Sequence, residues 1–141
     1  MHPSKTLFLD FDGVLHPTLP RHNERFGLAP MLSKVLDGFD CDVVISSSWR
    51  FQLDAAQLRL LLPKPLSSRI VGFTGKAIVG RHPRHREILA WLERHGARDW
   101  RALDDSAFEF PSPCPELIRC DGGRGVTVAE LSDLVAWLEN R

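Results

Sequence analysis

The fold of this chain is decided by the stretch LFLDFDGVL, residues 7–15. Its first three residues are apolar and predict a strand, which ends where two carboxylates and a glycine follow. Because residues i and i+2 of a strand point to the same side, we expect Asp10 and Asp12 on one face and Phe11 on the other. Two carboxylates this close repel each other unless a cation or a proton lies between them, so the pattern favours a divalent metal beside an acid–base pair. A solvated turn is the alternative interpretation, since Asp and Gly are common in turns.

Length and composition predict one globular domain over residues 1–141. Of the 141 residues, 43% are hydrophobic, which is enough to bury a sizeable core. The 18 basic and 18 acidic residues give a formal net charge of zero. The whole molecule therefore offers no general attraction to nucleic acid or to an anionic membrane.

The sequence predicts a cytoplasmic protein without a membrane segment. No apolar run approaches the length of a membrane span, and the N-terminus lacks the apolar core of a secretory signal. The three cysteines form no close pair and no metal-ligand spacing, so we expect reduced thiols. Cys41 and Cys120 are expected to be small core residues at the ends of strands.

Apolar runs typical of strands alternate with helical segments along the chain. Strands are predicted at residues 6–9, 42–45, 69–73, 100–103 and 116–120. Helices are predicted from Pro30, over residues 54–62, from Pro83 to near Gly96, and after a capping box at residues 127–130. This alternation predicts an α/β fold, a Rossmann-like three-layer α/β/α sandwich with a mostly parallel sheet. Residues 15–28 leave room only for a small β-flap, so no large cap domain is expected.

Small polar residues follow three of the predicted strands at the points where the chain leaves the sheet. They are Asp10 and Asp12, then Ser46, Ser47 and Ser48, then Asp104 and Asp105. Ligands of parallel sheets bind beyond the carboxyl ends of the strands. We therefore expect these side chains to converge on one site.

The chain resembles the haloacid-dehalogenase-like (HAD) superfamily of Mg²⁺-dependent aspartyl-phosphate phosphohydrolases. The four motifs of that superfamily are matched by Asp10-Phe11-Asp12-Gly13-Val14, by Ser46, by the helix start Arg84-His85-Arg86-Glu87-Ile88 and by the pair Asp104-Asp105. Within the superfamily, the stretches 46–50 and 102–105 are similar to the small capless HAD domains associated with RNA-repair proteins. Dehalogenase members lack the second carboxylate of the first motif, so Asp12 points to phosphoryl transfer.

The resemblance implies a phosphatase with a covalent aspartyl-phosphate intermediate. Asp10 would be the nucleophile, while Asp12 would protonate the leaving oxygen and then accept a proton from water. The phosphoryl group would be bound by Gly13, Ser46, Ser47 and Arg84.

The same resemblance implies Mg²⁺ as the cofactor. The ion would be held by the Asp10 carboxylate, the Asp12 carbonyl oxygen and Asp104. Asp105 would either bind the ion through water or orient Asp104.

Each assignment leaves an alternative open. The serines could cap the following helix, and the acidic pair at 104–105 could form a turn. The third-motif cation is Arg84, Arg86 or Lys76, and Arg84 fits the position at the start of the helix best. Trp49 either lines the pocket, together with Arg50, or packs in the core.

Without a cap, the site could admit a phosphate on a large molecule, such as a nucleic-acid end or a phosphoprotein. Residues 81–101 hold six Arg and three His, a bias that could face a polyanion or form a solvated helix face. Three classes of function remain: a capless phosphatase, a nucleic-acid end-processing module acting with repair partners, and a non-catalytic scaffold. The intact acidic set argues against the scaffold.

Overall fold

Five parallel strands form the centre of the computed structural model, which describes residues 5–140. The strands are β1 (Lys5–Leu9), β2 (Cys41–Ile45), β3 (Ile70–Phe73), β4 (Trp100–Asp104) and β5 (Leu117–Arg119), in the spatial order β3-β2-β1-β4-β5. In this register Leu9 lies between Ile45 of β2 and Leu103 of β4. The carboxyl ends of the three central strands therefore lie next to one another.

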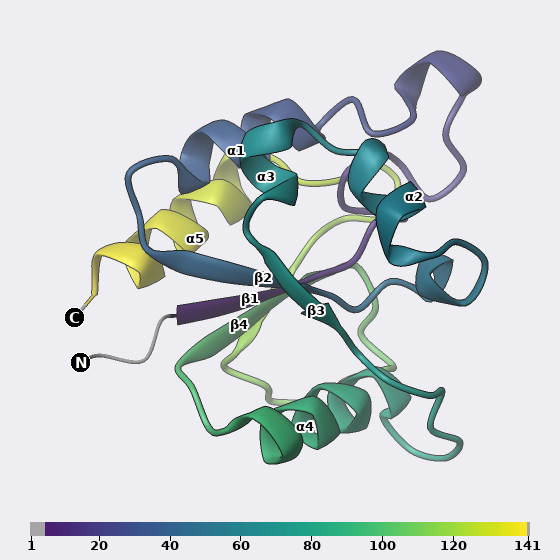
Figure 1. The fold of residues 1–141 in the computed structure, drawn as a ribbon, viewed down its shortest axis with the longest axis vertical. Helices are drawn as coiled ribbons and strands as arrows, with labels where there is room; N and C mark the ends of the chain where they lie inside the picture. The colour runs from purple at the N-terminus through teal and green to yellow at the C-terminus, as the bar shows by residue number, and fades with distance from the viewer. Residues whose placement is uncertain (1–4, 141) are drawn as a thin grey trace.

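Helices cover both faces of this sheet (Figure 1). One face carries α1 (Ala29–Leu36), α2 (Ala55–Leu60), α3 (Lys64–Ser67) and α5 (Val128–Glu139), and the other carries α4 (Pro83–His95). Side chains alternate between the faces, as the pleat of a strand requires. Leu7 and Leu9 pack toward the first group, whereas Phe8 packs edge-on against Trp91 and Trp100 at centroid distances of 5.6 and 5.7 Å. The predicted three-layer α/β/α sandwich is confirmed, and the sheet is parallel throughout.

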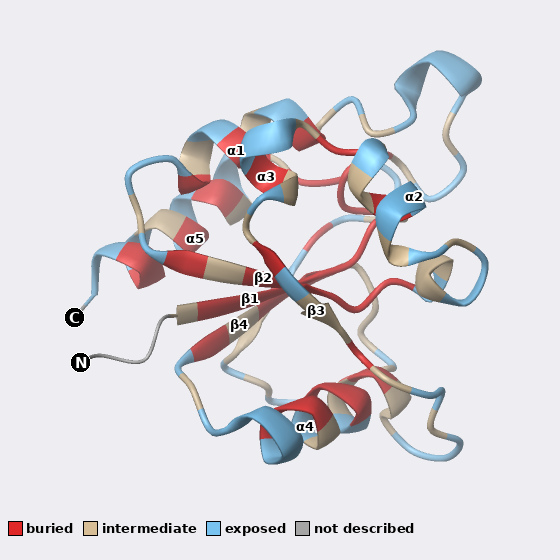
Figure 2. Cartoon of the chain, viewed as in Figure 1, coloured by how far each residue is buried: buried red, intermediate tan, exposed pale blue. Residues whose placement is uncertain are grey.

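Local sequence signals account for several element boundaries. The Thr127 side chain and Glu130 form the predicted capping box at the start of α5. Pro83 occupies the first turn of α4, and Gly96 ends that helix with a φ of 100°. The central strands β1, β2 and β4 and the inner faces of the helices are mostly buried, whereas the edge strands β3 and β5 are only partly buried (Figure 2).

The segment at residues 15–28 does not form the β-flap that its length suggested. It contains one short 3-10 helix, η1 (His22–Glu24), and an isolated bridge pairs Asp12 with His16. No strand is formed between residues 17 and 28, and the ends of the loop meet where the Leu28 N–H donates to the Leu15 carbonyl at 3.0 Å. Over residues 5–140 no helix has the length and apolar character needed to cross a bilayer.

Candidate active site

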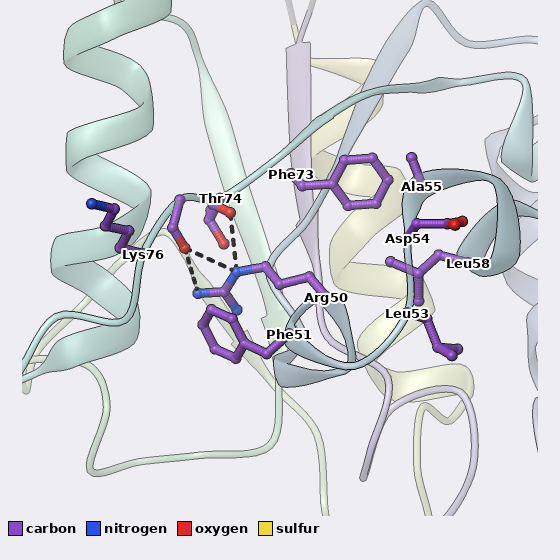
Figure 3. Close-up of a pocket in the computed structure, with 10 residues that line it drawn as sticks. Arg50, Phe51, Leu53, Asp54, Ala55, Leu58, Phe73, Thr74 and Lys76 are labelled. Carbon is purple, nitrogen blue, oxygen red and sulfur yellow. Dashed lines mark hydrogen bonds between the residues drawn. The ribbon is translucent and has the colours of Figure 1, made fainter.

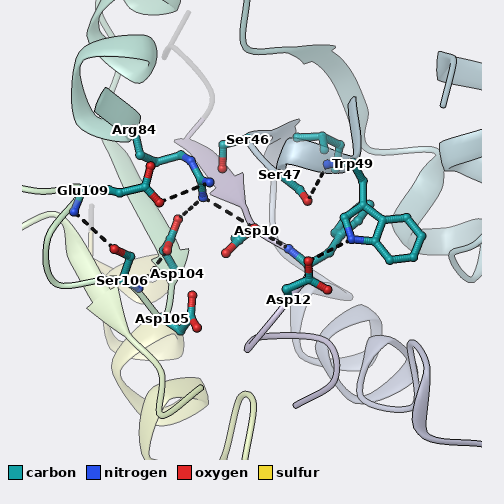
Figure 4. Close-up of polar contacts among 12 residues, drawn as sticks. Asp10, Asp12, Ser46, Ser47, Trp49, Arg84, Asp104, Asp105, Ser106 and Glu109 are labelled. Atoms are coloured by element: carbon teal, nitrogen blue, oxygen red, sulfur yellow. Dashed lines mark hydrogen bonds and ion pairs between the residues drawn. The ribbon is translucent and has the colours of Figure 1, made fainter. Parts of the chain in front are cut away.

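The site is built at the carboxyl ends of β2, β1 and β4 (Figure 4). The Asp10 N–H donates to the Leu103 carbonyl at 3.1 Å, and the Ser46 N–H donates to the Leu9 carbonyl at 3.0 Å. These bonds extend the sheet by one residue beyond each strand. Neighbouring strands are about 4.8 Å apart, so the first residues after the strands come into contact range.

Three carboxylates gather at this edge. Oxygen atoms of Asp10, Asp104 and Asp105 all lie within 4.8 Å of one another. Burial and the adjacent Asp104 charge raise the pKa of Asp10 well above its usual value, although Arg84 acts in the opposite direction. Burial likewise raises the pKa of Asp104 to about 6, against the lowering effect of Arg84. The acidic groups are thus held together at an electrostatic cost that a bound cation would relieve.

Arg84 is the cation that the fold brings to these carboxylates. Its Nη1 lies 2.6 Å from Asp104 Oδ2 and 3.5 Å from Asp10 Oδ1, and its Nη2 lies 3.4 Å from Glu109 Oε2. The side chain is buried in the first turn of α4. Of the two alternatives from the sequence, Arg86 is exposed and bonds the Val79 carbonyl, and Lys76 is exposed in the loop after β3.

The serines after β2 differ in their hydrogen bonds. Ser47 is buried, and its Oγ accepts the Trp49 N–H at 3.2 Å at the start of the 3-10 helix η2 (Ser48–Phe51). Ser47 therefore caps the start of η2, which is the alternative role that the sequence left open for the serines. Ser46 is also buried, but among the described residues its Oγ has no hydrogen-bond partner. A buried hydroxyl without a partner is rare in proteins, and Ser46 Oγ is therefore free to donate to a group bound at this edge of the sheet.

Gly13 has a steric reason to be glycine. Its φ is +77°, and a Cβ built on it would lie 2.2 Å from Asp105 Oδ2. Any side chain would therefore displace a member of the carboxylate cluster, in addition to straining the backbone. The phosphate-binding role expected for Gly13 stays a prediction.

The Arg50 side chain connects the segments that surround the site. Its guanidinium donates to the backbone carbonyls of Ser46, Ser47, Thr74 and Gly75, and it pairs with Glu87 at 2.8 Å. These contacts tie the turn after β2 to the loop after β3 and to α4. The sequence indicated Arg50 only as a pocket residue, because the carbonyls that it binds come from distant segments.

A cavity of about 360 Å³ lies beside Arg50, at the end of β3 (Figure 3). Its lining includes Phe51, Phe73 and Lys76, together with Arg50, which lies over the Phe51 ring at 4.0 Å from the centroid. Thr74, which also lines the cavity, donates its N–H to the last residue of β2 at 3.0 Å. The cavity is therefore one strand removed from Ser46.

Asp12 lies apart from the three clustered carboxylates. Its Oδ1 is 2.7 Å from His16 Nε2, and its Oδ2 accepts the Trp49 Nε1–H at 3.0 Å. Trp49 therefore lines the site and packs against the core as well. His16 was not identified from the sequence, where the only signal is its position four residues after Asp12.

Three of the six arginines in residues 81–101 are paired with carboxylates in different parts of the molecule. Arg84 lies in the site, whereas Arg98 pairs with Asp42 at 3.4 Å and Arg101 pairs with Asp99 at 3.5 Å, near the amino ends of the strands. These three arginines therefore do not contribute to one common polyanion-binding face.

The arrangement of motifs agrees with a comparison against known families. Residues 6–131 match the family described as the HAD domain in Swiss Army Knife RNA repair proteins. The chain belongs to this family. No curated protein and no solved structure gives a significant match. Membership in the HAD family accounts for the α/β fold, and it connects the chain with an RNA-repair context and, in general terms, with phosphohydrolase chemistry.

Proposed function

We propose that this HAD domain is a Mg²⁺-dependent phosphatase that hydrolyses phosphate monoesters through an aspartyl-phosphate on Asp10. One observation carries the proposal: the unpartnered Ser46 hydroxyl, the buried Arg84 and the carboxylate cluster meet at one edge of the sheet. Together they offer a nucleophile, phosphate-binding donors and oxygen ligands for a cation.

The roles of the protein groups follow from their positions. An Asp10 oxygen attacks phosphorus while the bond to the leaving oxygen breaks, and Asp12 gives its proton to that oxygen. Asp12 then takes a proton from water, which attacks phosphorus and releases inorganic phosphate with a free Asp10. The Ser46 hydroxyl and the Arg84 guanidinium donate to the phosphoryl oxygens throughout.

The donor set fits Mg²⁺. Carboxylates of Asp10 and Asp104 are buried within reach of each other and of Asp105, and Mg²⁺ prefers such oxygen ligands. These residues and the Asp12 carbonyl oxygen would hold the ion. When bound, it would offset negative charge on the phosphoryl oxygens.

A panel of phosphate esters tests the proposal. We expect phosphate release by the purified chain with Mg²⁺, loss of release in EDTA, and recovery when Mg²⁺ is returned. Asp10→Asn should be inactive, because the amide is a poor nucleophile. Absence of release from every ester would favour a non-catalytic scaffold, and equal activity of Asp10→Asn would refute Asp10 as the nucleophile.

The substrate class that we favour within this function is a nucleic-acid terminus. The RNA-repair context of the family supports it, as does the cavity at the end of β3, whose lining includes Phe51, which is 54% exposed, and the exposed Lys76. Aromatic faces stack unpaired bases, and cations contact the backbone. We expect 5′- or 3′-phosphorylated oligonucleotides to be hydrolysed more efficiently than small esters, with an affinity that falls steeply with salt. Equal efficiency on small esters and no salt dependence would argue for a small-molecule phosphatase.

A further inference from the structure

Asp12 is held by two donors that the catalytic motifs do not include. His16 Nε2 lies 2.7 Å from Oδ1, and Trp49 Nε1 donates to Oδ2 at 3.0 Å. The two contacts come from different segments, since His16 belongs to the loop after β1 and Trp49 to η2, and the two rings lie 6.1 Å apart. A carboxylate with one donor on each oxygen has its plane and its direction defined.

The direction of the His16 contact follows from its other ring nitrogen. His16 Nδ1 accepts the backbone N–H of Phe26 at 3.0 Å. The proton of the neutral ring is therefore on Nε2, which donates to Asp12. The His16 side chain is fully buried, so the ring is fixed in this orientation by its surroundings.

The backbone that fixes His16 is itself in an unusual conformation. Phe26 has a φ of +56°, which bulky residues seldom adopt. Its ring packs edge-on against Phe11, His16 and Trp49 at centroid distances of 5.3, 4.8 and 5.2 Å. Such strain persists where the surrounding contacts hold it, and it is concentrated at functional sites.

We propose that His16 and Trp49 are positioning residues that keep the Asp12 carboxylate out of the metal-binding cluster and available for proton transfer. This inference rests on the phosphatase function proposed above. Four aspartates lie at one edge of the sheet. Among the described residues, only Asp10, Asp104 and Asp105 bring carboxylate oxygens within 4.8 Å of one another. A carboxylate bound to the cation would be a poor proton carrier. Held by His16 and Trp49, the Asp12 side chain stays 41% exposed, and each oxygen keeps a free lone pair for the proton.

Three variants separate positioning from simple packing. His16→Leu removes the donor, His16→Gln places an amide N–H near the position of Nε2, and Trp49→Phe removes the indole N–H while keeping an aromatic ring. Trp91→Phe is the matched control, because Trp91 packs against Phe8 on the opposite face of the sheet.

The measurement is kcat/KM for a series of aryl and alkyl phosphates of increasing leaving-group pKa. Poor leaving groups need a proton from Asp12, and good ones do not. Because general acid catalysis contributes about 10²–10⁴-fold, we expect His16→Leu to lose about tenfold or more on alkyl phosphates and much less on p-nitrophenyl phosphate. Trp49→Phe should also make kcat/KM fall more steeply as the leaving-group pKa rises. His16→Gln and Trp91→Phe should both keep the dependence on leaving-group pKa that the wild type shows. Equal losses on all esters would show a structural role and overturn the inference.

A second measurement does not depend on turnover. ¹⁵N NMR of the histidine rings should find the His16 proton on Nε2, with a resonance that moves in Asp12→Ala. A proton on Nδ1 would overturn the inference, even if His16→Leu failed to fold. A wild-type chain inactive on every ester would refute the phosphatase function and this inference with it. If the wild type is active and His16→Leu and Trp49→Phe show the same dependence on leaving-group pKa as the wild type, the inference alone is refuted.

Discussion

Replacing Arg84 with methionine removes the positive charge from the carboxylate cluster and keeps most of the apolar stem. In the structure Nη1 lies 2.6 Å from Asp104 and 3.5 Å from Asp10. If Arg84 binds the phosphoryl group, the variant loses a charge-assisted hydrogen bond of about 1.5–3 kcal/mol. At 1.36 kcal/mol for each factor of ten, kcat/KM should fall by about 10- to 150-fold.

The same variant has a stability effect whose pH dependence follows from Asp104. Arg84 lowers the pKa of this buried carboxyl, which is nevertheless raised to about 6, so removing Arg84 raises it further. A carboxyl with a raised pKa in the folded state costs stability as the pH rises, because the folded state must then lose a proton that it holds. Below about pH 6 the carboxyl is protonated in both proteins and this difference vanishes. At pH 7, above this pKa, the variant should be less stable by on the order of 1 kcal/mol from Asp104 alone, without metal.

Two assays check these magnitudes. Steady-state kinetics at pH 7 with Mg²⁺ gives the efficiency, and urea unfolding in EDTA at pH 5.5 and 7.5 gives the free energies of unfolding. Arg86→Met is the matched control, since Arg86 lies two residues further along α4 and is exposed. A larger loss of efficiency in Arg86→Met or Lys76→Met would show that the third motif is misplaced, and an equal stability difference at both pH values would refute the electrostatic reasoning.

The remaining predictions concern the nucleophile, the hydroxyl and the metal. Asp10→Asn should form no phosphoenzyme when an acid-quenched reaction is analysed by mass spectrometry. Asp12→Asn should keep the nucleophile and turn over far more slowly. Normal turnover of Asp10→Asn would refute the covalent mechanism. Ser46→Ala should lower kcat/KM without lowering the denaturation midpoint, because its Oγ has no hydrogen bond to lose within the described chain; a clear loss of stability with full activity would contradict this. Millimolar Mg²⁺ should raise the melting temperature more at pH 7.5 than at pH 5, because Asp104, with a pKa of about 6, must release its proton to bind the ion; an equal or larger rise at pH 5 would count against Asp104 as a ligand.

Much of the fold could be predicted because its signals are local. The apolar runs at Leu7–Leu9 and Val43–Ile45 indicated strands of a parallel sheet, and both runs are buried in the structure. The capping box at Thr127 placed the start of α5 from four residues. The loop at residues 15–28 carries no such pattern, and its length alone led to the incorrect expectation of a β-flap.

The candidate site could be predicted in part for a related reason. Parallel strands bring their carboxyl ends to one edge, so Asp10, Ser46 and Asp104 could be expected to meet without any knowledge of side-chain packing. Whether a serine caps a helix or keeps a free hydroxyl depends on the path of the next turn. The structure gives the cap to Ser47 and leaves Ser46 without a partner among the described residues.

The sequence by itself determined the α/β class, the strands and the residue types at their ends, because periodicity and capping act over a few neighbouring residues. Only the tertiary structure decided which groups touch. Arg84 reaches Asp104 across 20 positions, Trp49 reaches Asp12 across 37, and Arg50 binds carbonyls of two separate turns. These contacts depend on how helices and loops pack on the sheet, and no pattern within a short window of residues encodes that packing.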